Sequence, residues 1–190
     1  MSPRRRLYLL ALGALAFLFT ACSGVRLRPD GTPEPQDCPR EALDAMARLG
    51  IHPKDSLTVL VDERWGDRGA TRLEEGPVVG YLDSSHEQLP ERTRLFGQVW
   101  TAGEMVTVRY YEAEVPGRSR MPFCAEVDDS GGQVKDPSSP RGVAIIQDNV
   151  ANARVVARYG EVDPSRPKGR LYIYGDVEEL PPDVRDSLKK

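Results

Sequence analysis

The stretch that decides the fold runs from residue 94 to residue 127, RLFGQVWTAGEMVTVRYYEAEVPGRSRMPFCAEV. It contains three runs rich in β-branched and aromatic residues, Arg94–Thr101, Met105–Val115 and Pro122–Val127, which is the composition of strands. Two short connections with glycine, Ala102-Gly103-Glu104 and Pro116-Gly117-Arg118, separate them and favour tight turns. The segment therefore predicts a meander of three antiparallel strands.

Further runs of the same kind flank this segment, and Gly, Pro, Asp and Ser bound them. No helical pattern separates the strands, which favours an antiparallel sheet over alternating strand and helix units. We therefore predict a mainly β domain over residues 38–190, an antiparallel β-barrel or sandwich of about seven to eight strands. The additional strands are Leu57–Asp62, Pro77–Leu82, Val143–Gln147, Arg154–Tyr159 and Arg170–Gly175.

Two helices are predicted at the edges of this domain. The first spans Pro39–Leu49, because proline suits the first helical position, Asp37 or Cys38 can cap it, and Gly50 stops it. Its apolar stripe needs a surface to lie on, which the sheet supplies. A short amphipathic helix, Pro181–Lys190, is expected at the C-terminus.

The N-terminus has the layout of an export signal. Arg4, Arg5 and Arg6 precede an uncharged run of 15 residues, Leu7–Ala21. A transmembrane helix needs about 20 apolar residues, so this run fits the apolar core of a signal peptide better than a permanent span. Residues 1–21 are therefore predicted to be a cleaved signal peptide.

The end of this region, Phe19-Thr20-Ala21-Cys22, resembles the lipobox of bacterial lipoproteins, although the family usually has leucine in place of Phe19. The resemblance implies that Cys22 becomes the new N-terminus and carries a diacylglycerol and a further acyl chain such as palmitate. Several chains together attach a protein stably, whereas one chain binds only marginally. Ser23 resembles the signal for sorting to the outer membrane. An ordinary signal peptide and an uncleaved anchor remain alternatives.

Residues 22–37 are predicted to be a lipidated tether rich in proline and glycine. Prolines stand at positions 29, 33 and 35, and large aliphatic residues are few. A polyproline-like chain extends by about 3.1 Å per residue. Such a tether would hold the domain a few tens of ångströms from the bilayer.

The chain has three cysteines, and lipidation of Cys22 leaves Cys38 and Cys124 as a pair. The oxidising periplasm permits a disulfide between them, which would stabilise the fold by about 4 to 5 kcal/mol in the chain-entropy model. Two alternatives stay open. The cysteines are separate buried thiols, or they bind a metal with His52 and His86, for which no CxxC spacing is present.

The charge balance limits the kinds of partner. The chain carries 26 basic and 29 acidic side chains. Removal of residues 1–21 takes away three arginines and no acid, which leaves 23 basic against the same 29 acidic residues, a net charge of −6. Nucleic acids and anionic headgroups attract basic surfaces, so this sign argues against nucleic-acid binding and against docking on lipid by overall charge.

Motifs for catalysis or metal binding are weak. Asp83-Ser84-Ser85-His86 contains the residue types of a hydrolase triad, but neighbours in one loop cannot adopt the required geometry. Asp129-Ser130-Gly131 resembles the D-[ST]-G of retroviral-type aspartic peptidases, without their apolar surroundings. Acidic residues between positions 176 and 186 lack the spacing of a calcium loop. We therefore predict no catalytic residue, no metal and no cofactor.

Aromatic residues are the more informative candidates for binding. Phe96 and Trp100 share one strand face, Tyr111 projects from the next strand, and Tyr172 and Tyr174 alternate with aliphatic residues. If these side chains are exposed, they form a docking patch for a protein or glycan. The simpler interpretation, which we favour, places them in the core.

In the order and spacing of short motifs such as Cys38-Pro39 and Pro116-Gly117, the mature chain resembles small uncharacterised lipoproteins of myxobacterial type. With Leu95, Gly97 and Pro116-Gly117 in matching places, the segment Leu89–Gly132 resembles, more distantly, part of the periplasmic β-barrel domain of VirB10-type secretion scaffolds. These resemblances imply the layout and the cysteine pair but no activity. The residues that carry them are Cys38-Pro39, Leu49-Gly50, Glu75-Gly76-Pro77-Val78, Leu89-Pro90, Leu95, Gly97, Pro116-Gly117 and Cys124.

Together these features predict a non-enzymatic lipoprotein of the cell envelope, anchored through Cys22 to the outer membrane, facing either the periplasm or the surface. It would act as an interaction or assembly module with a protein or glycan partner. Two other classes compete with this prediction. One is an envelope hydrolase, such as a dimeric peptidase that uses Asp129, and the other is a module that binds a small ligand inside the barrel.

Overall fold

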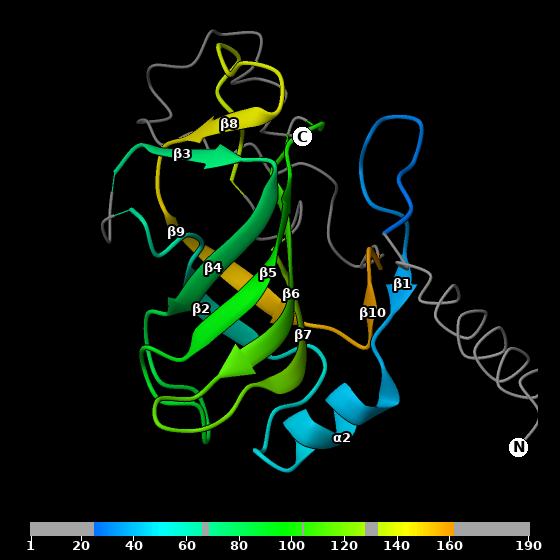
Figure 1. The fold of residues 1–190 in the computed structure, drawn as a ribbon, viewed down its shortest axis with the longest axis vertical. Helices are drawn as coiled ribbons and strands as arrows, with labels where there is room; N and C mark the ends of the chain where they lie inside the picture. Colours follow the sequence, from blue (N-terminus) through cyan, green and yellow to red (C-terminus); the bar gives the residue numbers. More distant parts are fainter. Residues whose placement is uncertain (1–24, 66–68, 104, 128–132, 162–190) are drawn as a thin grey trace, which may run out of the picture.

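A computed structural model describes residues 25–65, 69–103, 105–127 and 133–161 (Figure 1). Within these residues, six strands form a closed antiparallel barrel in the order β2-β4-β5-β6-β7-β9. The prediction of a mainly β antiparallel fold is confirmed, and the architecture is a barrel and not a sandwich. The barrel strands are β2 (Ser56–Leu60), β4 (Gly76–Leu82), β5 (Arg94–Trp100), β6 (Thr107–Glu114), β7 (Met121–Val127) and β9 (Val150–Val155).

The predicted meander is confirmed, because β5 pairs with β6 and β6 pairs with β7. Both ladders contain an irregularity, between Phe96 and Gly97 on one side and between Tyr110 and Glu112 on the other. Such bulges increase the local twist and bend a strand, as closure of a small barrel requires. Closure itself occurs at β2 and β9, which pair over Ser56–Leu60.

The interior of the barrel is organised around Tyr110, whose side chain reaches from β6 to the far wall. Its hydroxyl donates a hydrogen bond to the Val61 carbonyl at 3.3 Å. Glycines on β4 and β5 leave room for the ring. A Cβ atom at Gly80 would lie 2.7 Å from the Tyr110 hydroxyl, and one at Gly97 would lie 2.9 Å from a ring carbon. Both glycines are therefore required by close packing.

Two small sheets complete the described fold. Strands β3 (Thr71–Glu74) and β8 (Val143–Ile146) pair across one end of the barrel (Figure 1). Strands β1 (Gln36–Asp37) and β10 (Arg158–Tyr159) pair on the outside of the barrel. The sequence predicts β8, but it does not predict β1 and β3, which have only two and four residues.

The predicted strand Arg154–Tyr159 is wrong in its bounds. Pairing with β7 ends at Val155, and the chain then leaves the barrel wall to form β10 against β1. The reason is that Tyr159 packs on the outer face of the barrel and is fully buried there. A barrel strand and a covering strand thus follow one another within one apolar run.

The N-terminal segment also differs from the prediction of a tether. Residues 25–37, which we call the strap, include a hairpin-like bridge between Leu27 and Pro33, and they end in β1. The Cys38 amide donates to the Ala157 carbonyl at 2.9 Å. The strap therefore lies on the barrel, and its residues are not an extended spacer.

The predicted N-terminal helix is present as α2 (Arg40–Ala47) with Pro39 at its N-cap. Neither Asp37 nor Cys38 caps it, and Gly50 takes a φ of 76°, as a helix stop requires. The helix packs against β7 through Ala42, Ala45 and Met46. The predicted strand Arg170–Gly175, the predicted helix Pro181–Lys190, and the signal with Cys22 lie outside the described residues.

Candidate functional site

The buried charges of the barrel wall lie on its outer face. Arg109 of β6 and Glu126 of β7 are opposite each other in register, while their neighbours Tyr110 and Ala125 form the next pair and face the interior. The Arg109 Nε donates to Glu126 Oε1 at 2.7 Å, and each side chain is only 1% exposed. An ion pair on an outer face is buried in this way only because another part of the chain covers it.

The strap is that cover, and the ion pair holds it through main-chain atoms. Arg109 Nη1 donates to the Glu34 carbonyl at 2.9 Å, and Nη2 donates to the Pro33 carbonyl at 3.4 Å. On the acidic side, Glu126 Oε2 accepts from the Gly160 amide at 2.6 Å. Each charge is therefore satisfied by partners from separate segments, which is the condition under which burial of charge is tolerated.

Aromatic rings complete the enclosure of the Arg109 guanidinium. Its central carbon lies 5.6 Å from the centre of the Trp100 ring and 5.2 Å from that of Tyr159. Both rings are buried, and desolvated contacts of a cation with aromatic rings are worth more than exposed ones. We refer to Trp100, Arg109, Glu126 and Tyr159 as the covered cluster.

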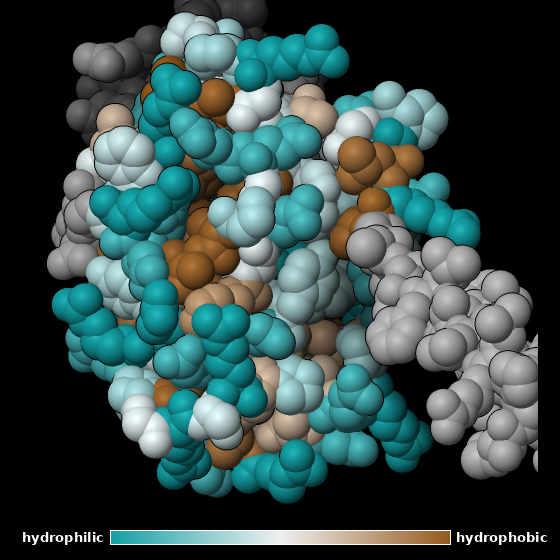
Figure 2. Space-filling model, viewed as in Figure 1, coloured by the Kyte–Doolittle hydropathy of each residue, from teal (hydrophilic) through white to brown (hydrophobic). Residues whose placement is uncertain are grey.

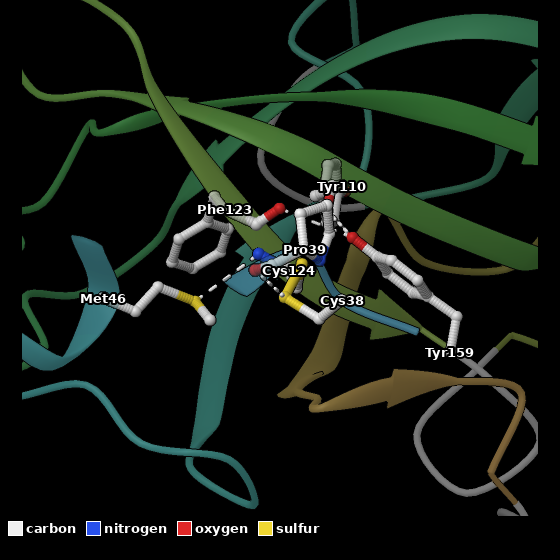
Figure 3. The surroundings of a disulfide bond; sticks show 7 residues. All are labelled: Cys38, Pro39, Met46, Tyr110, Phe123, Cys124 and Tyr159. Atoms are coloured by element: carbon white, nitrogen blue, oxygen red, sulfur yellow. Dashed lines mark hydrogen bonds between the residues drawn. A yellow bond between two sulfur atoms is a disulfide. The ribbon is translucent and has the colours of Figure 1, made fainter. Parts of the chain in front are cut away.

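A disulfide joins the residue after the strap to β7, the strand that also carries Glu126. Cys38 and Cys124 are bonded with a Cα–Cα distance of 6.0 Å (Figure 3). The Met46 sulfur accepts a hydrogen bond from the Cys124 amide at 3.4 Å, so that the helix also contacts this point. Because the two sulfurs are bonded to each other, the alternatives of free thiols and of a metal site with these cysteines are excluded.

Tyr159 connects the covering strand to the barrel main chain. Its hydroxyl lies 2.6 Å from the Tyr110 carbonyl and 3.4 Å from the Phe123 carbonyl, and it points at these atoms in Figure 3. Burial raises the pKa of Tyr159 far above its usual value. The hydroxyl therefore remains a neutral donor, as a structural hydrogen bond needs.

Tyr111 is the bulge residue of β6 and lies beside Tyr159, with ring centres 5.4 Å apart in an edge-to-face arrangement. Its hydroxyl oxygen is buried, and among the described residues it has no hydrogen-bond partner. Burial raises the pKa of Tyr111 to about 12. The ring thus packs at the edge of the covered cluster, where the nearby Arg109 guanidinium opposes part of this rise in pKa.

A second cluster of aromatic and arginine residues lies on the open part of the outer face. Phe96 is half-buried between two guanidinium groups, with Arg120 at 3.5 Å and Arg94 at 5.1 Å from the ring centre. Nearby, Arg92 lies 4.8 Å from the centre of the Tyr81 ring. We refer to these five residues as the open cluster.

Carboxylates neutralise the two arginines around Phe96. Arg94 binds Glu63 through two hydrogen bonds of 2.7 and 3.0 Å. Arg120 lies 3.2 Å from Glu114 and 3.5 Å from Glu112. Surfaces rich in arginine and aromatic side chains are typical of protein interfaces, and stacked, paired side chains lose little freedom on binding.

The five aromatic residues predicted to dock a partner do not share one environment. Phe96 and Trp100 both lie on the outer face of β5, but Trp100 is buried beside Arg109. Tyr111 is half-buried beside Tyr159. Tyr172 and Tyr174 lie outside the described residues. Of the described three, Phe96 alone belongs to the open cluster.

The chain's two histidines lie near one carboxylate, away from both clusters. His86 Nε2 is 3.3 Å from Asp55 Oδ2, and the same oxygen accepts from the His52 amide at 2.8 Å. The hydrogen bond from the His52 amide, together with that to His86, holds the pKa of Asp55 below its usual value. Ser84 and Ser85 are exposed in the loop before His86.

The remaining predictions of chemistry are not tested by this geometry. Asp129 lies outside the described residues. Within the described ranges, no group of three or more His, Cys, Asp or Glu side chains is placed to hold a metal ion. In the same part of the chain, no helix is long and apolar enough to cross a bilayer.

Comparison with known proteins gives no family for this chain. No model of a known protein family matches it, and no curated protein matches it.

Proposed function

We propose that this protein is a lipid-anchored, non-enzymatic interaction or assembly module of the bacterial cell envelope. In this proposal Cys22 carries the lipid, residues 1–21 are removed, and the barrel presents the open cluster to a protein or glycan partner. The proposed location is the outer membrane, with the barrel facing the periplasm or the surface.

The observation that supports the proposal most is the attachment of the strap. The first described residue, Val25, stands three positions after Cys22, and the strap that follows is held by the buried Arg109 and by the disulfide. A domain fixed so close to its anchor keeps one orientation relative to the membrane. A defined orientation is useful to a module that must meet a partner in the envelope.

The chemistry of the buried charges is consistent with this role. The Arg109 guanidinium donates to Glu126 and to two strap carbonyls, and these contacts hold the protein's own segments together. The open cluster, in contrast, places the half-buried Phe96 among paired charges at the surface. A protein interface of modest polarity fits such a surface better than a highly charged polymer does.

Intact mass of the membrane form, measured with and without reduction, tests the anchor. We expect a chain that begins at Cys22, carries acyl chains, and gains two hydrogens on reduction of Cys38–Cys124. A mass that corresponds to residues 1–190, or to an unmodified Cys22, would contradict the proposal.

Purification of the lipoprotein from native membranes tests the open cluster. The variant Phe96→Ser removes the half-buried ring at the centre of the open cluster without touching the covered cluster, and Val134→Ser is the matched control because Val134 is exposed elsewhere. We expect co-purifying envelope partners to be lost with Phe96→Ser and retained with Val134→Ser. Identical partners for both variants would overturn the proposed docking surface.

A further inference from the structure

The start of the strap is an ordered hairpin. The Arg28 amide donates to the Thr32 carbonyl and the Glu34 amide donates to the Arg26 carbonyl, each at 2.8 Å. The return arm of this hairpin is the part that Arg109 holds. The hairpin also lies close to the β5–β6 connection, because a Cβ atom at Gly31 would be 2.6 Å from that of Ala102.

The covalent distance from the anchor to this hairpin is short. Three peptide units separate Cys22 from Val25, and each spans at most about 3.8 Å between Cα atoms. A lipid on Cys22 therefore lies within about 11 Å of Val25, measured along the main chain. This inference rests on the proposed lipidation. It replaces the expectation of a tether of a few tens of ångströms, because most residues of that tether are fixed on the barrel.

The side chains at this point suit the surface of a bilayer. Leu27 is 49% exposed, although it is a large aliphatic residue, and Val25 precedes it by two positions on the same side of the extended arm. Figure 2 shows apolar surface on this hairpin, close to where the N-terminal residues drawn in grey begin, with hydrophilic side chains around it. An exposed leucine with a half-buried valine beside a lipid anchor has a nearby apolar phase to enter.

The charges of the arm also fit phospholipid headgroups. Arg26 and Arg28 alternate with the apolar pair and are exposed, and the first acidic residue after Cys22 is Asp30. Among the described residues neither arginine forms a salt bridge. Arginine stems extend along apolar surface while their guanidinium groups reach phosphate oxygens. Arg26 and Arg28 thus make the arm Val25–Arg28 positive, whereas Asp30 and Glu34 balance these charges within the whole hairpin and the mature chain is acidic.

We propose that the arm Val25–Arg28 is a membrane-contact surface, with Val25 and Leu27 inserted among the headgroups and Arg26 and Arg28 bound to lipid phosphates. The barrel then rests on the bilayer through the hairpin. Because the strap is fixed by Arg109 and the disulfide, this contact sets the orientation of the whole domain. The open cluster is presented at a constant angle to the membrane.

Depth-dependent fluorescence quenching tests this contact in the full lipoprotein. Acylation of Cys22 and the native disulfide leave no free thiol, so Leu27→Cys provides one site for a fluorescent label. Arg118→Cys is the matched control, since Arg118 is exposed in the turn after β6. This turn is at the opposite end of an eight-residue strand from the hairpin, a separation of about 27 Å.

Both labelled proteins are placed in phosphatidylethanolamine and phosphatidylglycerol vesicles that contain a headgroup-proximal spin-labelled lipid. We expect quenching at position 27 to exceed that at position 118 by about threefold or more, because interfacial insertion reaches only about 5 to 10 Å. A further substitution of Val25 by aspartate is expected to reduce the quenching at position 27 while the acyl chains remain.

The outcomes separate this inference from the proposed function. Acylated protein with equal quenching at positions 27 and 118 would overturn the membrane-contact surface and leave the lipoprotein proposal intact. Protein without acyl chains on Cys22 would overturn both. Acylated protein with strong quenching at position 27 alone supports both.

Discussion

The barrel carries two clusters of the same chemistry on its outer face, and they differ in what lies above them. In each, a guanidinium group is close to an aromatic ring and paired with a glutamate: Arg109 with Glu126, and Arg120 with Glu114. The first pair is 1% exposed on both sides, whereas Arg120 is 51% exposed. Whether the strap lies above a cluster therefore decides what the cluster contacts. One cluster fastens the chain to itself, and the other faces outward.

Removal of the disulfide should have the largest effect, because it releases the end of the strap from the covered face. The bond links positions 86 residues apart, and loss of such a cross-link should lower the free energy of unfolding by about 4 to 5 kcal/mol. Denaturant titration of the Cys38→Ala, Cys124→Ala double variant measures this loss. An unchanged midpoint and slope would show that the strap is held without the bond.

The two ion pairs should differ strongly when one partner is removed. Arg109→Met removes the buried ion-pair partner of Glu126, which should cost about 3 to 5 kcal/mol. Arg120→Met on the open face should cost at most about 1 kcal/mol, because the pair is solvated. Double-mutant cycles for Arg109 with Glu126 and for Arg120 with Glu114 measure the two coupling energies. Equal couplings would remove the distinction between the clusters.

Tyr159 of the covered cluster and the neighbouring Tyr111 should differ in how much their hydroxyl groups contribute to stability. Tyr159→Phe removes a hydroxyl that donates to a buried carbonyl and should lower stability by about 1 kcal/mol. Tyr111→Phe removes a buried hydroxyl that lies near the Arg109 guanidinium without a well-formed hydrogen bond, so it should lower stability less than Tyr159→Phe does. Thermal unfolding of both variants tests the difference. A large destabilisation by Tyr111→Phe would indicate a partner for its hydroxyl.

The smallest effect is expected at Asp55, which lies outside both clusters. Its pKa is lowered in the folded protein from the ordinary value of 3.8. The deprotonated carboxylate therefore stabilises the fold at neutral pH, and this contribution decreases as the pH falls through 3.8 toward the lower folded value. Asp55→Asn should flatten the pH dependence of stability below about pH 4 and leave it unchanged near pH 7. An identical acid limb in the variant would contradict the assignment.

Much of the fold follows from local patterns in the sequence. Runs rich in β-branched and aromatic residues, separated by glycine-containing turns, locate the meander β5–β6–β7. The glycine at position 50 locates the end of the helix, and the two cysteines that follow Cys22 locate the disulfide. Each of these signals arises from a few neighbouring residues or from a simple count. Short strands such as β3 and β1 lack enough residues to show a period.

The covered cluster could not be predicted in this way. Arg109 and Glu126 stand at outward positions of their strands, where a charged residue is normally exposed. Their burial depends on the strap, and the strap is bound through its own carbonyl groups. A contact with main-chain atoms leaves no mark in the side chains of the segment that provides them. The proline-rich composition of that segment therefore indicated a spacer.

Hydrogen exchange of the strap tests the central claim, that Arg109 fastens the segment after the anchor to the barrel. The informative amides are those of Glu34 in the strap, Cys38 directly after it and Gly160 after β10, which donate to the Arg26 carbonyl, the Ala157 carbonyl and the Glu126 carboxylate. In the wild-type protein these amides should be protected from exchange. Arg109→Met should accelerate their exchange by about a hundredfold, whereas the amides that form the hydrogen-bonded ladder of β4 with β5 should change less. Strap amides that exchange in the wild type as fast as in an unfolded chain would contradict the account.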